Sequence, residues 1–305
     1  MVLSQNTLST YNSLLNSLAR DLNYDMEYGM FPDGWKWLEN ITHIWSVIKS
    51  KTDSVFSQST IVFAIKNLLE IQNAPHSLIL EYGEIGKSCR AKIMSDYATH
   101  KKSKKQVENW ISIEDLHNIC SGLELLVPKK INNDNDYRCL IKYLVLKCHL
   151  DVPLRRDLTN CKIFLNPYES DISDKSYNYI ILNSSTLTAK YVGNYFKTSK
   201  YYGEITFTWS DELSRELFYY YNILKSFGQS NFFIVDYNKN QFEKTNYTKF
   251  LNSIFKVYKK RISTSILRNI IITDFYKKKE EDAKTFAYKC GHSQSCAYNI
   301  YNKIN

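Results

Sequence analysis

The spacing of apolar residues changes along the chain, and this change limits the available folds more than any other feature. From Leu8 to Tyr97, apolar residues recur at intervals of three and four, the period of helices that bury one face. Between residues 177 and 209 the segments are short, apolar and rich in β-branched and aromatic residues, as strands are. Helical spacing then returns. The sequence therefore predicts a mainly α fold with a small antiparallel β-sheet, of the α+β class.

Capping residues indicate where several of these elements begin. Ser112-Ile113-Glu114-Asp115 is typical of a capping box, and Ser210-Asp211-Glu212 is expected to cap a later helix. In the first third of the chain, four stripes of apolar residues at helical spacing predict helices. The stripes begin at Leu8, Trp37, Ile61 and Leu80. The other expected elements are helices at 112–126, 140–150, 213–227, 247–258, 264–276, 281–290 and 293–303 and strands at 177–182, 186–192 and 204–209.

A basic segment without apolar residues separates two periodic regions. His100-Lys101-Lys102-Ser103-Lys104-Lys105-Gln106 has nothing to bury, so a solvated linker is the simplest interpretation. We therefore expect two domains, 1–105 and 106–305. The four lysines, Lys101, Lys102, Lys104 and Lys105, are also suited to contact a phosphate backbone, and the sequence leaves both interpretations open.

The overall charge favours a polyanionic partner. The 305 residues carry a formal net charge of +9, and lysines and arginines gain free energy when they displace counterions from phosphates. Many basic proteins bind no nucleic acid. The charge alone therefore does not separate a DNA-binding protein from a basic interaction module.

The seven cysteines form no Cys-x-x-Cys pair. Their odd number and irregular spacing argue against a disulfide framework and a zinc site, and favour reduced thiols in an intracellular protein. The N-terminal 24 residues contain no apolar stretch typical of a secretory signal. No segment reaches the roughly 18 apolar residues of a membrane span. We expect neither a metal nor a membrane partner.

Two cationic segments in the second region contain candidate catalytic residues. Arg155 and Arg156 follow an apolar helix and Pro153, and a planar guanidinium is suited to hold two phosphate oxygens. Lys197 lies between strand-like segments, where a hairpin turn would hold a lysine able to donate a proton, and Lys200 follows it. Taken separately, each position is better explained as an ordinary surface cation.

Two further signals lie near the end of the chain. Ser263-Thr264-Ser265-Ile266-Leu267-Arg268 opens an apolar helix and places an arginine in its first turns. Gly291-His292-Ser293 ends one helix and caps the next, which carries Tyr301 and, one turn earlier, the alternative Tyr298. A tyrosine is a weak nucleophile at its ordinary pKa, so it needs neighbours that stabilise the phenolate.

Together these signals resemble the catalytic pattern of the tyrosine recombinases, the phage-integrase family: Arg, Lys, His-x-x-Arg, Gly-His, Tyr. The resemblance covers most of the chain, and it implies a helical core-binding domain at 1–105 and a catalytic domain at 106–305. The Pro153–Asp157 segment, the basic segment and the Lys197–Gly203 segment are more similar to recombinases of cryptons and large DNA viruses. The catalytic residues that it implies are Arg155, Lys197, Ser265, Arg268, His292 and Tyr301.

The chain departs from the family pattern at two positions. The glycine that usually precedes the first arginine is missing, so Arg156 stays an alternative to Arg155. Ser265 stands where His-x-x-Arg begins with histidine, and a hydroxyl can hydrogen-bond phosphate but cannot take up a proton near neutral pH. A catalytically weakened DNA-binding protein is therefore the alternative function.

The resemblance also implies a reaction. Tyr301 would attack a phosphodiester and form a 3′-phosphotyrosyl link, with Arg155, Arg268 and His292 on the non-bridging oxygens. Lys197 would protonate the leaving 5′ oxygen, and the arginines would replace a metal, so no cofactor is expected. The implied partners are duplex DNA and copies of the chain in a tetramer on DNA, in the nucleus or at a viral replication site. Arg156, Lys200 and the four lysines of the basic segment would contact the DNA.

Overall fold

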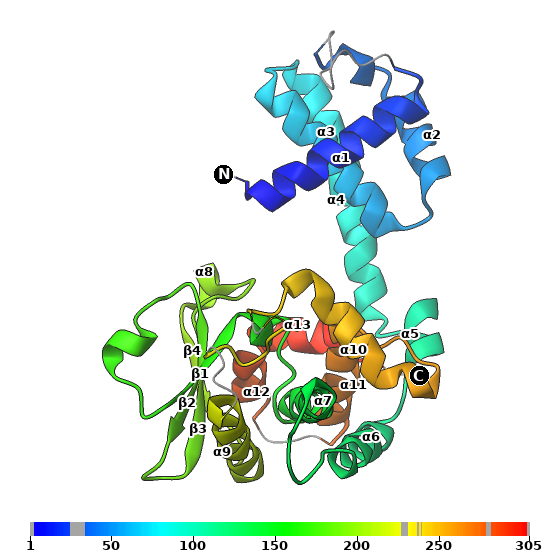
Figure 1. Ribbon diagram of the computed structural model, residues 1–305. Helices are drawn as coiled ribbons and strands as arrows, with labels where there is room; N and C mark the ends of the chain where they lie inside the picture. The colour runs from blue at the N-terminus through cyan, green and yellow to red at the C-terminus, as the bar shows by residue number, and fades with distance from the viewer. Residues whose placement is uncertain are drawn as a thin grey trace. The chain divides into compact units, whose positions relative to one another are not determined.

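The computed structural model describes residues 3–24, 34–226, 231–236, 238, 240–278 and 282–303. The chain forms two compact units, Met1–Thr99 and His100–Asn305, whose elements are labelled in Figure 1. The basic segment therefore lies at the start of the second unit, whereas its lysines are expected in the first domain, 1–105. Among the described residues, no helix is both long enough and apolar enough to cross a membrane.

The first unit packs helices around one apolar core that includes Leu18 and Leu69. The Tyr82 hydroxyl is buried in it and donates to the Leu38 carbonyl oxygen at 2.9 Å. The four predicted stripes are confirmed, but the second is divided because Asn40 caps a new helix, accepting from the His43 N–H at 3.1 Å. The elements are α1 (Gln5–Asp21), the 3-10 turn η1 (Lys36–Leu38), α2 (Ile41–Lys51), α3 (Val55–Ile71) and α4 (His76–Ala98).

The second unit is built around α7 (Asp134–Asp151), in the lower half of Figure 1. Helix α7 contacts α6 (Ile113–Leu125), α9 (Asp211–Ser226) and α11 (Thr264–Lys277). Leu144, Val145 and Leu146 follow one another and are all buried, so α7 is covered on more than one side, as expected for a helix enclosed by its neighbours. The surrounding helices are α5 (Lys104–Asn109), α6 (Ile113–Leu125), α8 (Ser199–Tyr202), α9 (Asp211–Ser226), α10 (Tyr247–Phe255), α11 (Thr264–Lys277), α12 (Ala283–Lys289) and α13 (Gln294–Cys296). Short 3-10 turns occur at η2 (Asp157–Asn160), η3 (Glu169–Ile172), η4 (Lys244–Asn246) and η5 (Lys256–Tyr258).

A four-stranded sheet packs against these helices in the order β1 (Cys161–Leu165), β2 (Asn178–Asn183), β3 (Thr188–Gly193) and β4 (Ile205–Thr208). The three predicted strands and the α+β class are confirmed. The sheet is mixed rather than antiparallel, because β1, which is not among the predicted strands, pairs parallel to β2. The other edge of β1 is also paired, since the Ile163 N–H donates to the Asn231 carbonyl oxygen at 2.7 Å.

One row of apolar side chains crosses the sheet and joins it to the helices. Ile163, Ile180, Tyr191 and Phe207 lie opposite one another on successive strands and are all buried. The rings of Tyr191 and Phe207 stack with centroids 5.0 Å apart. Helix α9 contacts β1, β2 and β3, so the sheet and α7 share a single core. Burial of each such side chain stabilises the fold by about 1.5–3 kcal/mol.

The basic segment is more ordered than a linker. Ser103 and Gln106 form a capping box that starts α5, with the Gln106 N–H on Ser103 Oγ at 3.3 Å and the Ser103 N–H on Gln106 Oε1 at 2.7 Å. Lys102 lies over the ring of Trp110, with its Nζ 4.2 Å from the centroid. Residues 102–106 therefore have local structure, although Ser103, Lys104 and Lys105 are exposed, and a role as a linker stays a prediction.

The last predicted helix, 293–303, is divided and too long. After α13 the chain makes a π-helical turn, η6 (Ala297–Tyr301), and Asn302 is extended. The hydroxyl of Thr273 on α11 donates to the Tyr301 carbonyl oxygen at 3.2 Å and accepts from the Lys303 N–H at 2.8 Å. These bonds hold the end of the chain on α11 and end the helix at Tyr301.

Candidate active site

The first component of the site is a buried arginine on α11. Ser263 caps this helix, and Arg268 lies in its second turn with 1% of its surface exposed. The guanidinium donates to the Pro153 carbonyl oxygen and, at 3.1 Å, to the Cys290 carbonyl oxygen. A buried charge requires such partners to offset the loss of water. Arg268 thereby joins α11 to the segment after α7 and to the turn after α12.

Tyr301 lies between this arginine and His292. The Arg268 guanidinium carbon is 4.9 Å from the centroid of the Tyr301 ring, and the His292 ring stacks on Tyr301 at 5.0 Å with an interplanar angle of 15°. The Arg155 side chain lies near enough to help lower the pKa of Tyr301. The tyrosine ring also packs against a small apolar cluster formed by Ile272, Ala287 and Ala297.

The two arginines make the Tyr301 phenolate easier to form. Burial alone would raise the pKa of Tyr301, since it disfavours the charged form. The charge of Arg268, together with the hydrogen bond and charge of Arg155, outweighs burial, and the pKa is lowered from its usual value. A tyrosine with a lowered pKa beside two guanidinium groups is poised to act as a nucleophile toward an anionic ester.

His292 is buried and neutral. Burial, followed by the charges of Arg268 and Arg155, lowers its pKa to about 3. Among the described residues, neither of its ring nitrogens has a partner that meets the geometry of a hydrogen bond. A neutral imidazole has one N–H donor and one acceptor nitrogen, so His292 can offer a single hydrogen bond to a bound anion but no positive charge.

The buried histidines predict that the folded chain loses stability in acid. The pKa values of His149 and His292 are both lowered from 6.5 to about 3, chiefly by burial. The unfolded chain therefore binds protons that the folded chain does not. Stability from these groups is fully present above about pH 6.5 and is lost as the pH falls toward 3, by up to roughly 1.4 kcal/mol per pH unit for each. Melting temperatures measured between about pH 7 and pH 4 should fall accordingly.

Two substitutions test whether the buried histidines cause this loss of stability in acid. His149→Gln should make the melting temperature less dependent on pH, because it removes one of the buried titrating groups. The matched control is His117→Gln, since His117 is exposed in the same unit and should leave the pH dependence unchanged. A melting temperature that does not change with pH in the wild type would contradict the prediction.

Gly291 shapes the turn that presents His292. Its φ of 72° lies in the left-handed region that favours glycine. The Thr198 hydroxyl donates to the Gly291 carbonyl oxygen at 2.8 Å, and the ring of Phe196 lies 3.4 Å from where a Cβ on Gly291 would be. The β3–β4 connection is therefore attached to the turn on both sides of Lys197.

We expect Gly291→Ala to destabilise the second unit. A left-handed backbone costs a residue with a Cβ about 1–2 kcal/mol, and the new Cβ would press on Phe196. The melting temperature should fall by about 2–8 °C. Gly122→Ala in α6 is the control, because a Cβ there meets no atom within 4 Å and alanine favours the helix. Equal effects of the two changes would show that the turn does not depend on glycine.

The structure distinguishes the two arginines after α7. Arg155 is half-buried and contacts Tyr301, whereas Arg156 is exposed. Buried Asp157 accepts from the Arg155 backbone N–H at 3.3 Å and so supports this bend. Burial raises the pKa of Asp157, although the charges of Arg268, Lys244 and Arg155 oppose that rise. The geometry therefore favours Arg155 over Arg156 as the partner of Tyr301.

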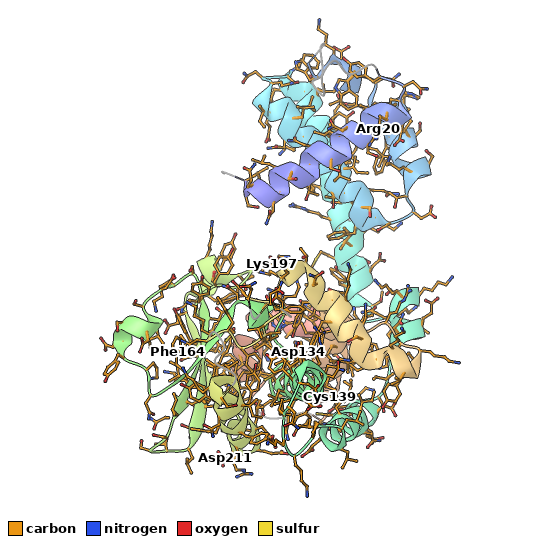
Figure 2. The ribbon with its side chains drawn as sticks, viewed as in Figure 1. Arg20, Asp134, Cys139, Phe164, Lys197 and Asp211 are labelled. Carbon is orange, nitrogen blue, oxygen red and sulfur yellow. The ribbon has the colours of Figure 1, made fainter. Side chains whose placement is uncertain are left out.

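The remaining candidates lie outside this group of contacts. Lys197, labelled in Figure 2, is exposed in the connection between β3 and β4, with exposed Lys200 in α8. Ser265 is exposed in the first turn of α11, and it makes no hydrogen bond with Tyr301 in the described part of the chain. Lys101, Lys104 and Lys105 are exposed as well. The site thus brings together Arg155, Arg268, His292 and Tyr301 and leaves the predicted lysines at the surface.

Three neighbours of the site are not predicted from the sequence. Thr273 holds the Tyr301 backbone, and Asp157 holds that of Arg155. The thiol of Cys296 lies close enough to interact with Tyr301, and burial raises its pKa while Arg155 and Arg268 oppose the rise. Asp157 could have been found as the acid directly after the arginine pair, but Thr273 and Cys296 carry no comparable signal.

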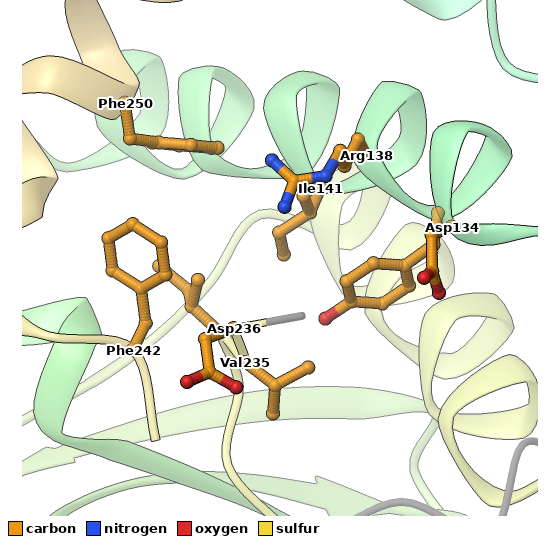
Figure 3. A pocket seen from close by; sticks show the side chains of 9 residues that line it. Asp134, Arg138, Ile141, Val235, Asp236, Phe242 and Phe250 are labelled. Carbon is orange, nitrogen blue, oxygen red and sulfur yellow. The ribbon is translucent and has the colours of Figure 1, made fainter. Parts of the chain in front are cut away.

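A separate hollow of about 370 Å³ opens beside the first half of α7 (Figure 3). Ile141, Val235, Phe242 and Phe250 give it largely apolar walls, with Arg138 and two aspartates among its lining. A helix rises 1.5 Å per residue, so Asp134 lies roughly 25 Å from the end of α7 that leads to Pro153. This hollow is therefore not part of the site. No group of three or more His, Cys, Asp or Glu side chains among the described residues is placed to hold a metal ion.

Comparisons with known proteins do not by themselves assign a function to this chain. No family model matches the sequence, and no curated protein matches it. A crystal structure of XerA recombinase aligns with 99% of this chain and 89% of that chain, at 14% identity and a TM-score of 0.46. At these values the likeness carries no argument about function, so any assignment rests on the residues of the site.

Proposed function

We propose that this protein cuts and rejoins strands of duplex DNA through a covalent bond to Tyr301, as tyrosine recombinases do. The observation that carries the proposal is the position of Tyr301 between the Arg268 guanidinium and the stacked His292 ring. The nearby Arg155 helps to lower the pKa of Tyr301. The chemistry of this group suits attack on a phosphodiester, whose charge rises in the transition state and is stabilised by fixed cationic donors.

The reaction conserves bonds, so it needs no energy source. Tyr301 loses its phenolic proton to solvent, and its oxygen attacks phosphorus and forms a 3′-phosphotyrosyl ester. The bond from phosphorus to the 5′ oxygen breaks, and the ammonium of Lys197 gives that oxygen a proton. A 5′ hydroxyl then attacks the ester, gives its proton to the Lys197 amine and restores a phosphodiester. Tyr301 leaves as a phenolate and takes up a proton from solvent. Lys197 is exposed on a connection attached to the His292 turn, so it is free to approach a bound strand.

The roles of the other candidates follow from charge and exposure. His292, being neutral, contributes one hydrogen bond to a phosphate oxygen. Ser265 can hydrogen-bond DNA but cannot act as a base near neutral pH. Arg156, Lys200 and the lysines of the basic segment are proposed DNA contacts. The similarity to recombinases of cryptons and large DNA viruses, and a tetramer on DNA, remain part of the proposal.

Covalent trapping tests the proposal. The protein is mixed with a nicked duplex whose cleavage releases a short fragment, so that the 5′ hydroxyl needed for rejoining is lost. We expect a protein–DNA adduct that survives denaturation. An alternative function is DNA binding without cleavage, which the exposed Ser265 in place of histidine favours. Tight, salt-dependent binding with no adduct on any duplex would support that alternative.

A further inference from the structure

A second basic feature of the molecule lies outside the site described above. A hollow of about 1280 Å³ opens between α5, α10 and the segment that leads into α11. Figure 1 shows this segment, in orange, next to α5. Six of the residues that line the hollow are cationic: Lys105, Lys249, Lys256, Lys259, Lys260 and Arg261. None of its lining residues is acidic.

Two hydrogen bonds join the walls of this hollow, which we call the basic hollow. The Lys260 ammonium donates to the Glu108 carbonyl oxygen at 2.8 Å, and the Arg261 N–H donates to Asn109 Oδ1 at 2.7 Å. Lys259 has a φ of 54°, which turns the chain sharply between η5 and these bonds. The end of α5 and the segment 259–261 are therefore held together, and the basic hollow is part of the fold.

The positive charge of the basic hollow is not balanced within the described part of the chain. No ion pair between described residues includes any of its six cations. A cation near the C-terminus of α10 is favoured by the helix dipole, but this effect accounts for one or two charges rather than six. Like charges in one hollow repel each other and oppose folding, so a bound polyanion would relieve that cost.

We propose that the basic hollow binds consecutive phosphates of a nucleic-acid backbone, apart from the phosphodiester that reacts at Tyr301. The choice of nucleic acid as the polyanion rests on the proposed function. None of Arg155, Arg268, His292 and Tyr301 lines the hollow, so it adds a non-reacting contact. Lys105 is the one lysine of the basic segment that lines it, which gives that segment a defined place on the backbone.

The slope of log affinity against log salt concentration tests this proposal. Each phosphate neutralised on duplex DNA adds roughly 0.9 to that slope. The variant replaces Lys249, Lys256 and Lys259 with glutamine, because these side chains are exposed and no hydrogen bond joins them to another described residue. The control replaces Lys129, Lys130 and Lys190, which are exposed and do not line the hollow. Both variants lose the same charge.

We expect the first variant to lower the slope by roughly 2 to 3 on a short duplex of arbitrary sequence, and the control to lower it by less than about 1. Equal slopes for the two variants, or an unchanged slope for the first, would overturn the proposal. Trapping on the nicked duplex is measured in parallel. A lowered slope without any adduct would support the basic hollow as a nucleic-acid site and reject the recombinase reaction. An adduct with an unchanged slope would support the recombinase reaction and reject the basic hollow as a nucleic-acid site.

Discussion

A Tyr301→Phe variant should form no covalent adduct with DNA, while its affinity for DNA stays within about twofold of the wild type. Phenylalanine lacks only the hydroxyl oxygen, which is the proposed nucleophile. The ring would keep its stacking on His292 and its packing against Ile272, Ala287 and Ala297. The fold should therefore be retained, as a melting curve would show, and the loss of adduct would report the chemistry alone.

Tyr298→Phe is the matched control for this substitution. Tyr298 lies in the same π-helical turn but contacts the rings of His100 and Tyr276 rather than the arginines, and 47% of it is exposed. We expect adduct formation at the wild-type rate. If Tyr298→Phe lost the adduct and Tyr301→Phe kept it, the nucleophile would be Tyr298, and the group around Tyr301 would have a structural role.

The second large effect is expected for Arg155→Ala, which should slow adduct formation by about 10²–10³-fold, the usual loss for one transition-state donor. Arg155 is half-buried and does not carry the internal bonds that Arg268 makes to Pro153 and Cys290. Its removal should therefore affect the reaction more than the fold. Arg156→Ala is the control, since Arg156 is exposed, and should change the rate by less than about tenfold.

The pH dependence separates two catalytic roles of Arg155, one on Tyr301 and one on the bound phosphate. Its hydrogen bond and charge help to lower the pKa of Tyr301, so its loss should raise that pKa. Adduct formation by Arg155→Ala should then require a higher pH than in the wild type. A uniform loss of rate at all pH values would mean that Arg155 acts on the bound phosphate and has no effect on the tyrosine. A larger effect at Arg156 would reverse the assignment of the two arginines.

Local sequence determined most of the helices. The stripes in the first third and the box at Ser112 depend on residues three or four positions apart, which the chain brings together as soon as a helix forms. Strands β2, β3 and β4 were predicted for a similar reason, because their composition and turns are local. Strand β1 was missed, since its five residues acquire their structure from parallel pairing with a strand that lies farther along the chain.

The residue types of the site could be read from the sequence, but their arrangement could not. The chain order of Arg155, Arg268, His292 and Tyr301 is a property of the sequence. So is the glycine at position 291, which the left-handed turn there requires. Only the fold decides that Arg155 rather than Arg156 meets Tyr301, because the bend held by Asp157 directs one side chain inward. The fold also buries His292 beside two guanidinium groups and so keeps it neutral, and it gathers Lys105 and residues 249–261 into one hollow. Burial and the distance between charges depend on segments far apart in the chain, and for that reason the tertiary structure alone determines them.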